Sequence, residues 1–410
     1  MVKKYLHKLL HKQHYWRTIN FDELSEIYAA TMMRSLAISM VGIFIPVYLY
    51  KLGYSITLIF MVFAAYFSSR VVLDFASAFT TARIGPKHTM IIGQALQITS
   101  SALFLTLPVI HWPLLLVGGV WGSAASFYFI PFHIDLSKIK HKNHGGKELG
   151  YVQIMEKIGQ VLGPIIGGIV ATMFSPRYIF LVSIVMLIAG LWPLFRTAEP
   201  VQLKQKLDYK TFPLHKVRMN IPAYIGLNIE NTFCLMLWPL FLAIFVLPGN
   251  AVFAKVGALL SISVVASILA ARAIGQTVDN KKGRVLLRYS ATINALVYLV
   301  RLIVVNYPMA LVTNIANEAV TMGYRLPFTK GFYDQADDLP GYRIVYISSM
   351  EVIGCIAKAT AWWFLVALST ILSPRTVITV GFAIAAAASL LIMTEKFDSL
   401  NYNTGKGQNG

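Results

Sequence analysis

Long apolar segments alternate with short polar ones along the whole chain. Many of them approach the roughly 20 residues that a helix needs to cross about 30 Å of hydrocarbon. Twelve such segments lie near residues 24–49, 56–79, 88–108, 111–133, 150–174, 177–195, 219–247, 252–275, 285–305, 308–329, 342–370 and 375–395. Because the alternating ten-residue strands of a membrane barrel are absent from the pattern, it predicts an all-α polytopic membrane protein with twelve transmembrane helices.

A polar stretch divides these segments into two groups of six. Residues 196–218 contain prolines and many basic residues but no apolar run, which is typical of a linker. Short fragments also recur in order, such as MEKIG at 155–159 and MEVIG at 350–354, which indicates duplication. We therefore expect two pseudo-symmetric six-helix bundles. The expected parts are a basic arm (1–20), an N-terminal bundle (21–195), a linker (196–218), a C-terminal bundle (219–395) and a tail (396–410).

Composition supports a membrane protein, and the charge distribution predicts its orientation. Of the 410 residues 56% are hydrophobic and 13% are charged, whereas soluble domains are about a quarter charged. Basic residues, which give the net charge of +18, lie mostly on the termini and on alternate loops between the apolar segments. The remaining loops carry only three, Lys51, Arg177 and Arg375. By the positive-inside rule, both termini are expected on the cytoplasmic side of the plasma (inner) membrane. Anionic lipids, rather than nucleic acid, are then the expected partner of the excess charge.

Motifs of catalytic or ATP-driven proteins are missing. The chain has no Walker loop, zinc motif or nucleophile elbow, so we expect neither an enzyme nor a metal or other cofactor. The two cysteines, Cys234 and Cys355, lie in apolar runs and indicate small core residues rather than disulfides. A monomer is the expected functional unit.

The glycine-rich stretch GYVQIMEKIGQVLGPIIGG at 150–168 has unusually regular spacing. It resembles the antiporter motif of fifth spans in the major facilitator superfamily of secondary transporters. The matching residues are Gly150, Gly159, Gly163, Pro164, Gly167 and Gly168. Glycines four residues apart let helix backbones approach closely, and proline kinks a helix. The resemblance implies antiport, although the same residues also suit an ordinary close helix crossing.

A second resemblance to this family lies in the loops after the second span of each half. The family pattern is Gly-x-x-x-Asp-x-x-Gly-Arg. The second half has GQTVDNKKGR, with Asp279, Gly283 and Arg284, one residue longer than usual. The first half keeps Arg83 and Gly85 but has alanine where the family has its first glycine and its aspartate. The resemblance implies that these loops belong to an inner gate, degraded in the first half.

Polar residues inside the predicted spans are the candidates for substrate and proton binding. The resemblance implies that spans 1, 4, 7 and 10 line a central cavity. Candidates there are Arg34 in span 1, Tyr128 in span 4, Glu230 and Asn231 in span 7, and Asn314, Asn317, Glu318 and Arg325 in span 10. Glu318 is about ten residues, or roughly 15 Å, from either end, too deep to reach an interface. Because burial makes a carboxyl group suitable for proton exchange, we expect Glu318 and Glu230 to couple protons, with Arg34 or Arg325 as modulating cations.

Other charged residues are expected to act at span ends or in local pairs. Glu156 and Glu351, in the repeated fragments, are expected near the inner end as gate residues. Arg70 and Asp74 are four residues apart, the spacing of a helical ion pair. Arg301 is expected to extend to the membrane surface, as is Lys157.

Together these features predict alternating access by a secondary transporter of a small solute. Proton-coupled export of a drug-like or amphipathic compound is the favoured function, because of the glycine motif. A uniporter or symporter of a metabolite remains open, as does a sensor or scaffold with a transporter fold. The sequence does not identify the substrate.

Overall fold

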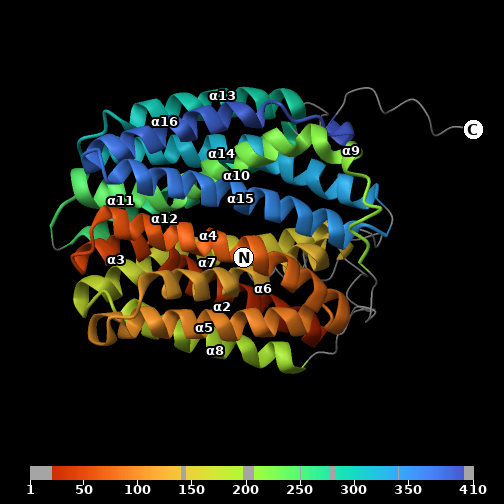
Figure 1. The fold of residues 1–410 in the computed structure, drawn as a ribbon, viewed down its shortest axis with the longest axis horizontal. Coiled ribbons are helices and arrows are strands. Elements are labelled where there is room, and N and C mark those ends of the chain that lie inside the picture. The colour runs from red at the N-terminus through yellow and green to blue at the C-terminus, as the bar shows by residue number, and fades with distance from the viewer. Residues whose placement is uncertain are drawn as a thin grey trace, which may run out of the picture.

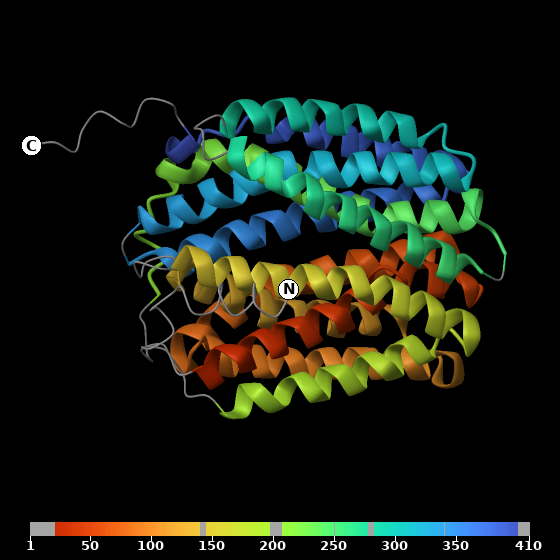
Figure 2. The ribbon, with the colours of Figure 1, turned by 180° about the vertical axis from the view of Figure 1, so that it is seen from behind.

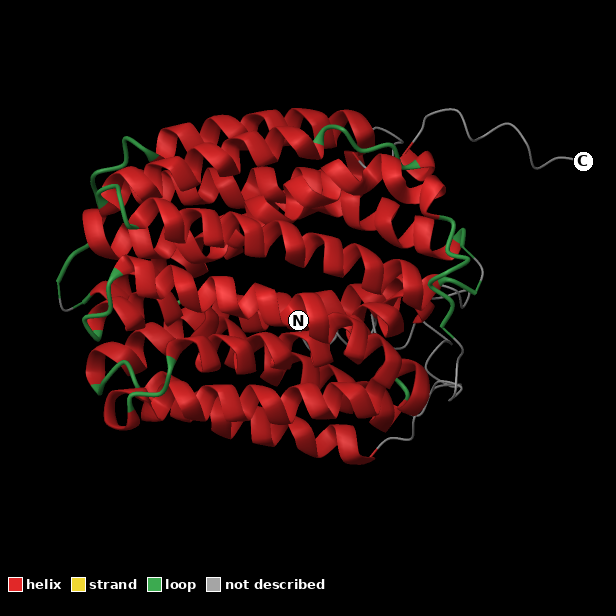
Figure 3. Ribbon diagram, in the orientation of Figure 1, coloured by secondary structure: helices red, strands yellow, loops and turns green. Residues whose placement is uncertain are grey.

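The computed structural model describes residues 21–139, 145–196, 207–249, 251–277, 283–339 and 341–400. All regular elements in this part of the chain are helices (Figure 3). The first half contains α2 (Phe21–Gly42), α3 (Ile45–Lys51), α4 (Ile56–Ile84), α5 (Pro86–Ile110), α6 (Leu114–Ile139), α7 (Gly145–Met173) and α8 (Tyr178–Arg196). Five of the six predicted apolar segments of this half coincide with one helix each, and the segment near 24–49 coincides with the two helices α2 and α3.

The second half repeats this arrangement after a short linker helix. It contains α9 (Leu214–Val217), η2 (Arg218–Asn220), α10 (Ile221–Thr232), η3 (Phe233–Leu237), α11 (Trp238–Phe241), η4 (Leu242–Val246), α12 (Val252–Thr277), α13 (Gly283–Arg301), α14 (Tyr307–Asp337), α15 (Arg343–Ser369), α16 (Pro374–Ile392) and η6 (Asp398–Leu400). The elements from α10 to η4 form one continuous helical rod, in which η3 and η4 are π-helical. Such π-helical segments occur frequently at functional sites.

The length and polarity of these helices identify a multi-pass membrane protein. Eight helical stretches in the described residues are long and apolar enough to cross a membrane. Helices α13 and α14 are similarly long, with 19 and 31 residues, but they carry more charged side chains. The total of twelve crossings stays a prediction.

The two halves of the chain lie side by side. Helices α2 to α8 form one side of the molecule and α10 to α16 the other (Figures 1 and 2). The most extensive contacts between the sides are those of α4 with α15 and of α7 with α12. The segment around α9 lies at one end of the molecule, which we call the linker end, and the opposite end is called the far end.

Aromatic side chains close the contact between α4 and α15 toward the far end. The fully buried ring of Trp362 lies 5.3 Å from that of Phe60 and 4.8 Å from that of Phe63, between ring centroids. Buried aromatic pairs at such distances stabilise a contact beyond the effect of burial alone. The same end is joined by a hydrogen bond between the hydroxyl groups of Thr57 and Ser369, 2.9 Å apart.

The glycines of α7 bring its backbone against two neighbouring helices. A Cβ atom added to Gly159 would lie 2.6 Å from the backbone nitrogen of Leu36 on α2, and one on Gly168 would lie 2.7 Å from the carbonyl oxygen of Phe253 on α12. Gly163 and Gly167 also contact α2 without space for a side chain. The motif residues therefore make α7 the close neighbour of a helix from each half.

The linker packs over the contact between α4 and α15 at the linker end. The hydroxyl groups of Tyr209 and Ser348 are hydrogen-bonded at 2.8 Å, and the Tyr209 ring packs against Phe75 and Phe79 of α4. Burial raises the pKa of the Tyr209 phenol above its ordinary value, so this tyrosine stays neutral and suited to an apolar contact.

Candidate functional site

Glu318 lies where charged residues of both halves come together. Its half-buried carboxyl group is acted on by the charge of Lys157, from α7 in the first half, and by that of Arg325 on its own helix. Arg325 in turn donates a hydrogen bond of 2.5 Å to the Oδ1 atom of Asn231 on α10. This arrangement combines one carboxylate, two cations and a carboxamide, which suits exchange of a proton or of a polar substrate group.

Lys157 does not have the role that its position in the sequence suggested. We expected it to extend to the membrane surface, but the structure places its charge close to Glu318 and Arg325. The neighbouring Glu156 remains half-buried, and its carbonyl oxygen accepts a hydrogen bond of 2.7 Å from Ser35 on α2. Its carboxyl group is near the charge of Lys157.

Glu230 lies inside the C-terminal half, in a network of neutral donors. It is 2% exposed, and its Oε1 atom accepts hydrogen bonds from Asn294 at 3.1 Å and from the Tyr298 hydroxyl at 2.8 Å, both on α13. Asn317 donates to the Oδ1 atom of Asn294 at 2.7 Å. Buried polar groups joined in this way fix the packing of the helices that carry them, so Glu230 connects α10 to α13 and α14.

Arg301 belongs to the same network, which contradicts the expectation that it reaches the membrane surface. Its side chain is completely buried, and its Nη2 atom donates to the Oδ1 atom of Asn317 at 2.8 Å. The guanidinium carbon lies 4.6 Å from the ring centroid of Trp238 and 4.5 Å from that of Tyr298. Favourable contacts with two aromatic faces and an amide oxygen hold the cation inside the bundle.

Arg34 lies in the interior of the N-terminal half. It is 4% exposed, it donates to the carboxamide oxygen of Gln94 on α5, and its guanidinium carbon lies 3.2 Å from the ring centroid of Tyr128 on α6. The acidic residue whose charge acts on it among the described residues is Glu156. The structure therefore brings together two predicted site residues, Arg34 and Tyr128, but within one half rather than beside Glu318.

A polar network crosses between the halves around Glu351 on α15. One carboxylate oxygen accepts from the Tyr224 hydroxyl at 2.6 Å, and the other accepts from the Nη2 atom of Arg70 on α4 at 3.2 Å. The Nε2 atom of His133 on α6 is 3.9 Å from the first oxygen. The predicted pair of Arg70 with Asp74 is confirmed, at 3.4 Å. Glu351 is therefore the acceptor that connects α4 and α6 with α10 and α15.

The same network contains carboxylate and thiol groups, which are common metal ligands. Ligand atoms of Asp74, Glu351 and Cys355 lie within 4.8 Å of one another. Arg70 donates to both carboxylates, and its guanidinium already supplies the positive charge that a metal ion would bring. The donor set therefore fits an interhelical ion pair better than a cation site.

The gate-loop residues hold the ends of their helices at the linker end. Gly85 has a φ angle of 91° between α4 and α5, a left-handed conformation that glycine adopts at no steric cost. Gly283 begins α13, and Arg284 binds Glu395 at 2.8 Å and the carbonyl oxygen of Phe397 at 2.8 Å. Arg83 is exposed in the last turn of α4, and Asp279 lies outside the described residues.

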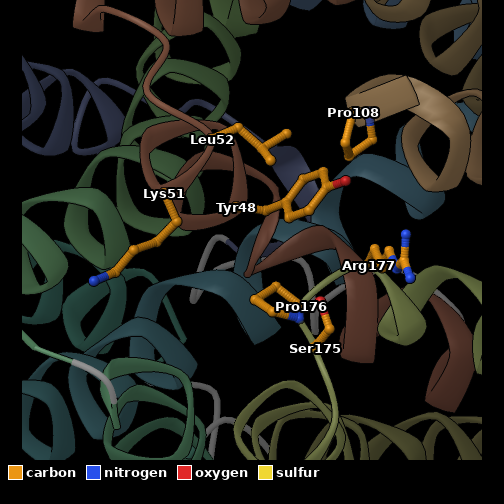
Figure 4. A pocket seen from close by; sticks show the side chains of 7 residues that line it. All are labelled: Tyr48, Lys51, Leu52, Pro108, Ser175, Pro176 and Arg177. Carbon is orange, nitrogen blue, oxygen red and sulfur yellow. The ribbon is translucent and has the colours of Figure 1, made fainter. Parts of the chain in front are cut away.

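A cavity of about 300 Å³ lies at the far end of the first half. Its lining includes Tyr48, Lys51, Pro108 and Arg177 (Figure 4). The amino group of Lys51 and the guanidinium of Arg177 extend from opposite sides of the cavity, and Lys51 donates to the carbonyl oxygen of Gly249 in the other half at 3.0 Å. The two cations do not converge on one ligand, so this cavity is not the candidate site.

Several residues of these networks were not singled out in the sequence. They are His133, Asn294, Gln94 and Lys358, whose Nζ atom donates to Asn228 at 2.8 Å. Each is a polar residue inside an apolar segment, and this is the sequence feature that indicates a partner inside the bundle. Their partners lie on other helices, so the sequence alone does not show which of them meet.

Comparison with known proteins agrees with the arrangement of helices. A model of the Major Facilitator Superfamily matches residues 27–332. The chain belongs to the major facilitator superfamily. A search of the curated proteins finds no match.

Two solved structures share the fold at low sequence identity. One is a D-xylose-proton symporter, with a TM-score of 0.70 and 11% identity, covering 92% of this chain and 97% of that one. The other is the peptide transporter POT in complex with sulfate, with a TM-score of 0.69 and 10% identity, covering 92% of this chain and 94% of that one. Family and fold together identify a secondary transporter rather than an enzyme.

Proposed function

We propose that this superfamily member exports a small amphipathic or drug-like solute in exchange for protons. The observation that carries the proposal is the position of Glu318. Its half-buried carboxyl group lies deep in α14, near Lys157 of the N-terminal half and Arg325 of the same helix. Moving one half relative to the other changes the distance from Lys157 to Glu318. Proton affinity and conformation are then coupled, because a nearby cation stabilises the ionised carboxylate.

The two halves move, in this proposal, as bundles of residues 21–195 and 219–395 about the contacts of α4 with α15 and α7 with α12. The Glu351 network closes one end, and the aromatic contacts around Trp362 close the other. In this proposal Asn231 and Arg325, which are hydrogen-bonded to each other, contact the polar part of a substrate, with the Arg325 charge acting on Glu318. Asn314, Asn317 and Glu230 contribute by fixing the helices behind it.

The orientation in the membrane is part of the proposal. Basic residues concentrate on the connections at the linker end, which the positive-inside rule assigns to the cytoplasm. Both termini are then cytoplasmic, in the plasma (inner) membrane, with protons and membrane lipids as partners and a monomer as the functional unit.

The coupling role of Glu318 is tested in proteoliposomes with an imposed pH gradient. Drug-like cations identified by thermal shift on the purified protein serve as substrates. Glu318→Gln should abolish flux driven by the gradient and retain exchange of labelled for unlabelled substrate. Asp338→Asn, an exposed carboxyl group at the end of the same helix, is the matched control and should transport normally. Undiminished gradient-driven flux in Glu318→Gln would contradict the assignment.

A uniporter or symporter of a metabolite is the second candidate. The packing of the α7 glycines is compatible with it, because close contact with α2 serves any transporter of this fold. The direction of coupling separates the candidates. Substrate accumulation in the compartment with lower pH indicates antiport, accumulation in the opposite compartment indicates symport, and equilibration indicates uniport. A protein that binds substrate but shows no flux under any gradient would be the sensor or scaffold.

A further inference from the structure

Four polar hydrogen-bond donors are buried without an acceptor in one region of the C-terminal half. They are the Nε and Nη1 atoms of Arg301, the Nδ2 atom of Asn314 and the Nε1 atom of Trp238, none of which has an acceptor among the described residues. The three side chains are at most 1% exposed. Leaving a buried donor unpaired costs about 1–3 kcal/mol, and more for a charged group.

These donors come from three helical segments, and those of Arg301 and Trp238 belong to side chains in contact. The Trp238 ring, at the start of α11, lies against the Arg301 guanidinium. Asn314 precedes Asn317 by one turn of α14, on the same face, and Asn317 is the residue that accepts from Arg301. The preceding π-helical segment η3 carries Cys234, which also contacts the Arg301 guanidinium at 3.5 Å.

Arg301 has no carboxylate in direct contact. No described carboxylate lies within ion-pair distance of it, and the charge of Glu230 acts on it from beyond the Tyr298 hydroxyl and the amides of Asn317 and Asn294. A buried cation with free N–H groups favours an anion that can accept hydrogen bonds. Because the surrounding residues have almost no exposed surface, the anion must be small.

We propose that Arg301, Asn314 and Trp238 form a binding site for a small monovalent anion of halide size. The site lies within the C-terminal half, and its Asn314 is one helical turn from Glu318 on α14. An anion there would satisfy the buried donors and stabilise the packing of α10 to α14. This proposal does not depend on the direction or coupling of transport.

The test is the thermal stability of the purified protein in detergent at constant ionic strength. Replacing gluconate, which is too large for the site, by chloride or bromide should raise Tm in a saturable way. The rise in Tm with formate, compared with that with chloride, shows whether the site prefers a small carboxylate or a halide. Arg301→Gln should remove the dependence, whereas Arg177→Gln, which changes an exposed cation at the same end of the molecule, should keep it.

A second variant keeps the test decisive if Arg301→Gln does not fold. Asn314→Leu removes one donor at similar volume, so it should weaken chloride binding about tenfold and raise Tm in gluconate. A Tm of the wild type that is independent of chloride overturns the proposal. So does a chloride dependence that persists unchanged in Asn314→Leu, because it would reflect a general salt effect or donors bound to water alone.

Discussion

At the scale of single residues, the two deep glutamates have different surroundings. Glu230 is almost completely buried and accepts two hydrogen bonds from α13. Glu318 is half-buried, among the charges of Lys157 and Arg325. A carboxyl group fixed by neutral donors is suited to holding helices together, and one surrounded by movable cations is suited to coupling.

This difference predicts that Glu230→Gln destabilises the protein more than Glu318→Gln. A glutamine at 230 would keep an oxygen for Asn294 and Tyr298 but accept weaker hydrogen bonds than a carboxylate. It would also remove a negative charge that acts on Arg301, with an expected loss of roughly 1–3 kcal/mol. Tm of both variants in detergent, at fixed chloride, measures the effect. Equal stability of the two variants, with lost coupling only in Glu230→Gln, would instead make Glu230 the proton site.

At the scale of elements, the packing of α7 gives a prediction about its glycines. Gly163→Ala forces the new methyl group against Ser39 and the backbone of α2, and such overpacking typically costs 1–3 kcal/mol. We expect a lower Tm and reduced transport. Gly119→Ala on α6 is the control, because a Cβ atom there meets nothing within 4 Å. A neutral Gly163→Ala would show that the close contact of α7 with α2 is not needed.

The contact of α4 with α15 gives a second prediction at this scale. Glu351→Gln weakens the link to Arg70 that joins the halves, so the linker end should open more often. Cys355, which is fully buried beside Asp74, should then be alkylated by N-ethylmaleimide about tenfold faster, equivalent to roughly 1.4 kcal/mol. Mass spectrometry measures each cysteine separately, with Cys234 as reference.

Asp337→Asn is the control for that experiment. It breaks an ion pair with Arg343 at 2.6 Å, but both partners belong to the second half. Alkylation of Cys355 should therefore stay at the wild-type rate. If Asp337→Asn and Glu351→Gln accelerate it equally, the change reflects general loosening rather than opening between the halves.

At the scale of the whole molecule, alternating access requires that the far end opens. The hydroxyl groups of Thr57 and Ser369 are 2.9 Å apart across the halves, close enough for cysteines there to form a disulfide. The double variant Thr57→Cys/Ser369→Cys should lose transport on oxidation and recover it on reduction. Each single variant should be insensitive to oxidant. Full transport by the oxidised double variant would contradict rocking about these contacts.

The sequence gives most of the helices because local composition decides them. Apolar runs long enough to span the membrane predicted every long helix, but not the short α9 and η6. The spacing of Arg70 and Asp74 predicted a pair that the structure contains. Arg301 shows the limit. Its place near the end of α13 suggested exposure, but whether a long side chain turns outward or inward depends on which rings and amides the neighbouring helices present.

The sequence by itself determined the fold class, the family and the polar residues available inside the membrane. It did so because hydrophobic length, charge asymmetry and glycine spacing are properties of consecutive residues. Only the tertiary structure decided which polar residues meet. Lys157 lies near Glu318, Arg70 binds Glu351, and Arg301 joins the network of Glu230. The rotation of each helix about its axis sets these contacts, and that rotation is fixed by packing against helices distant in the chain.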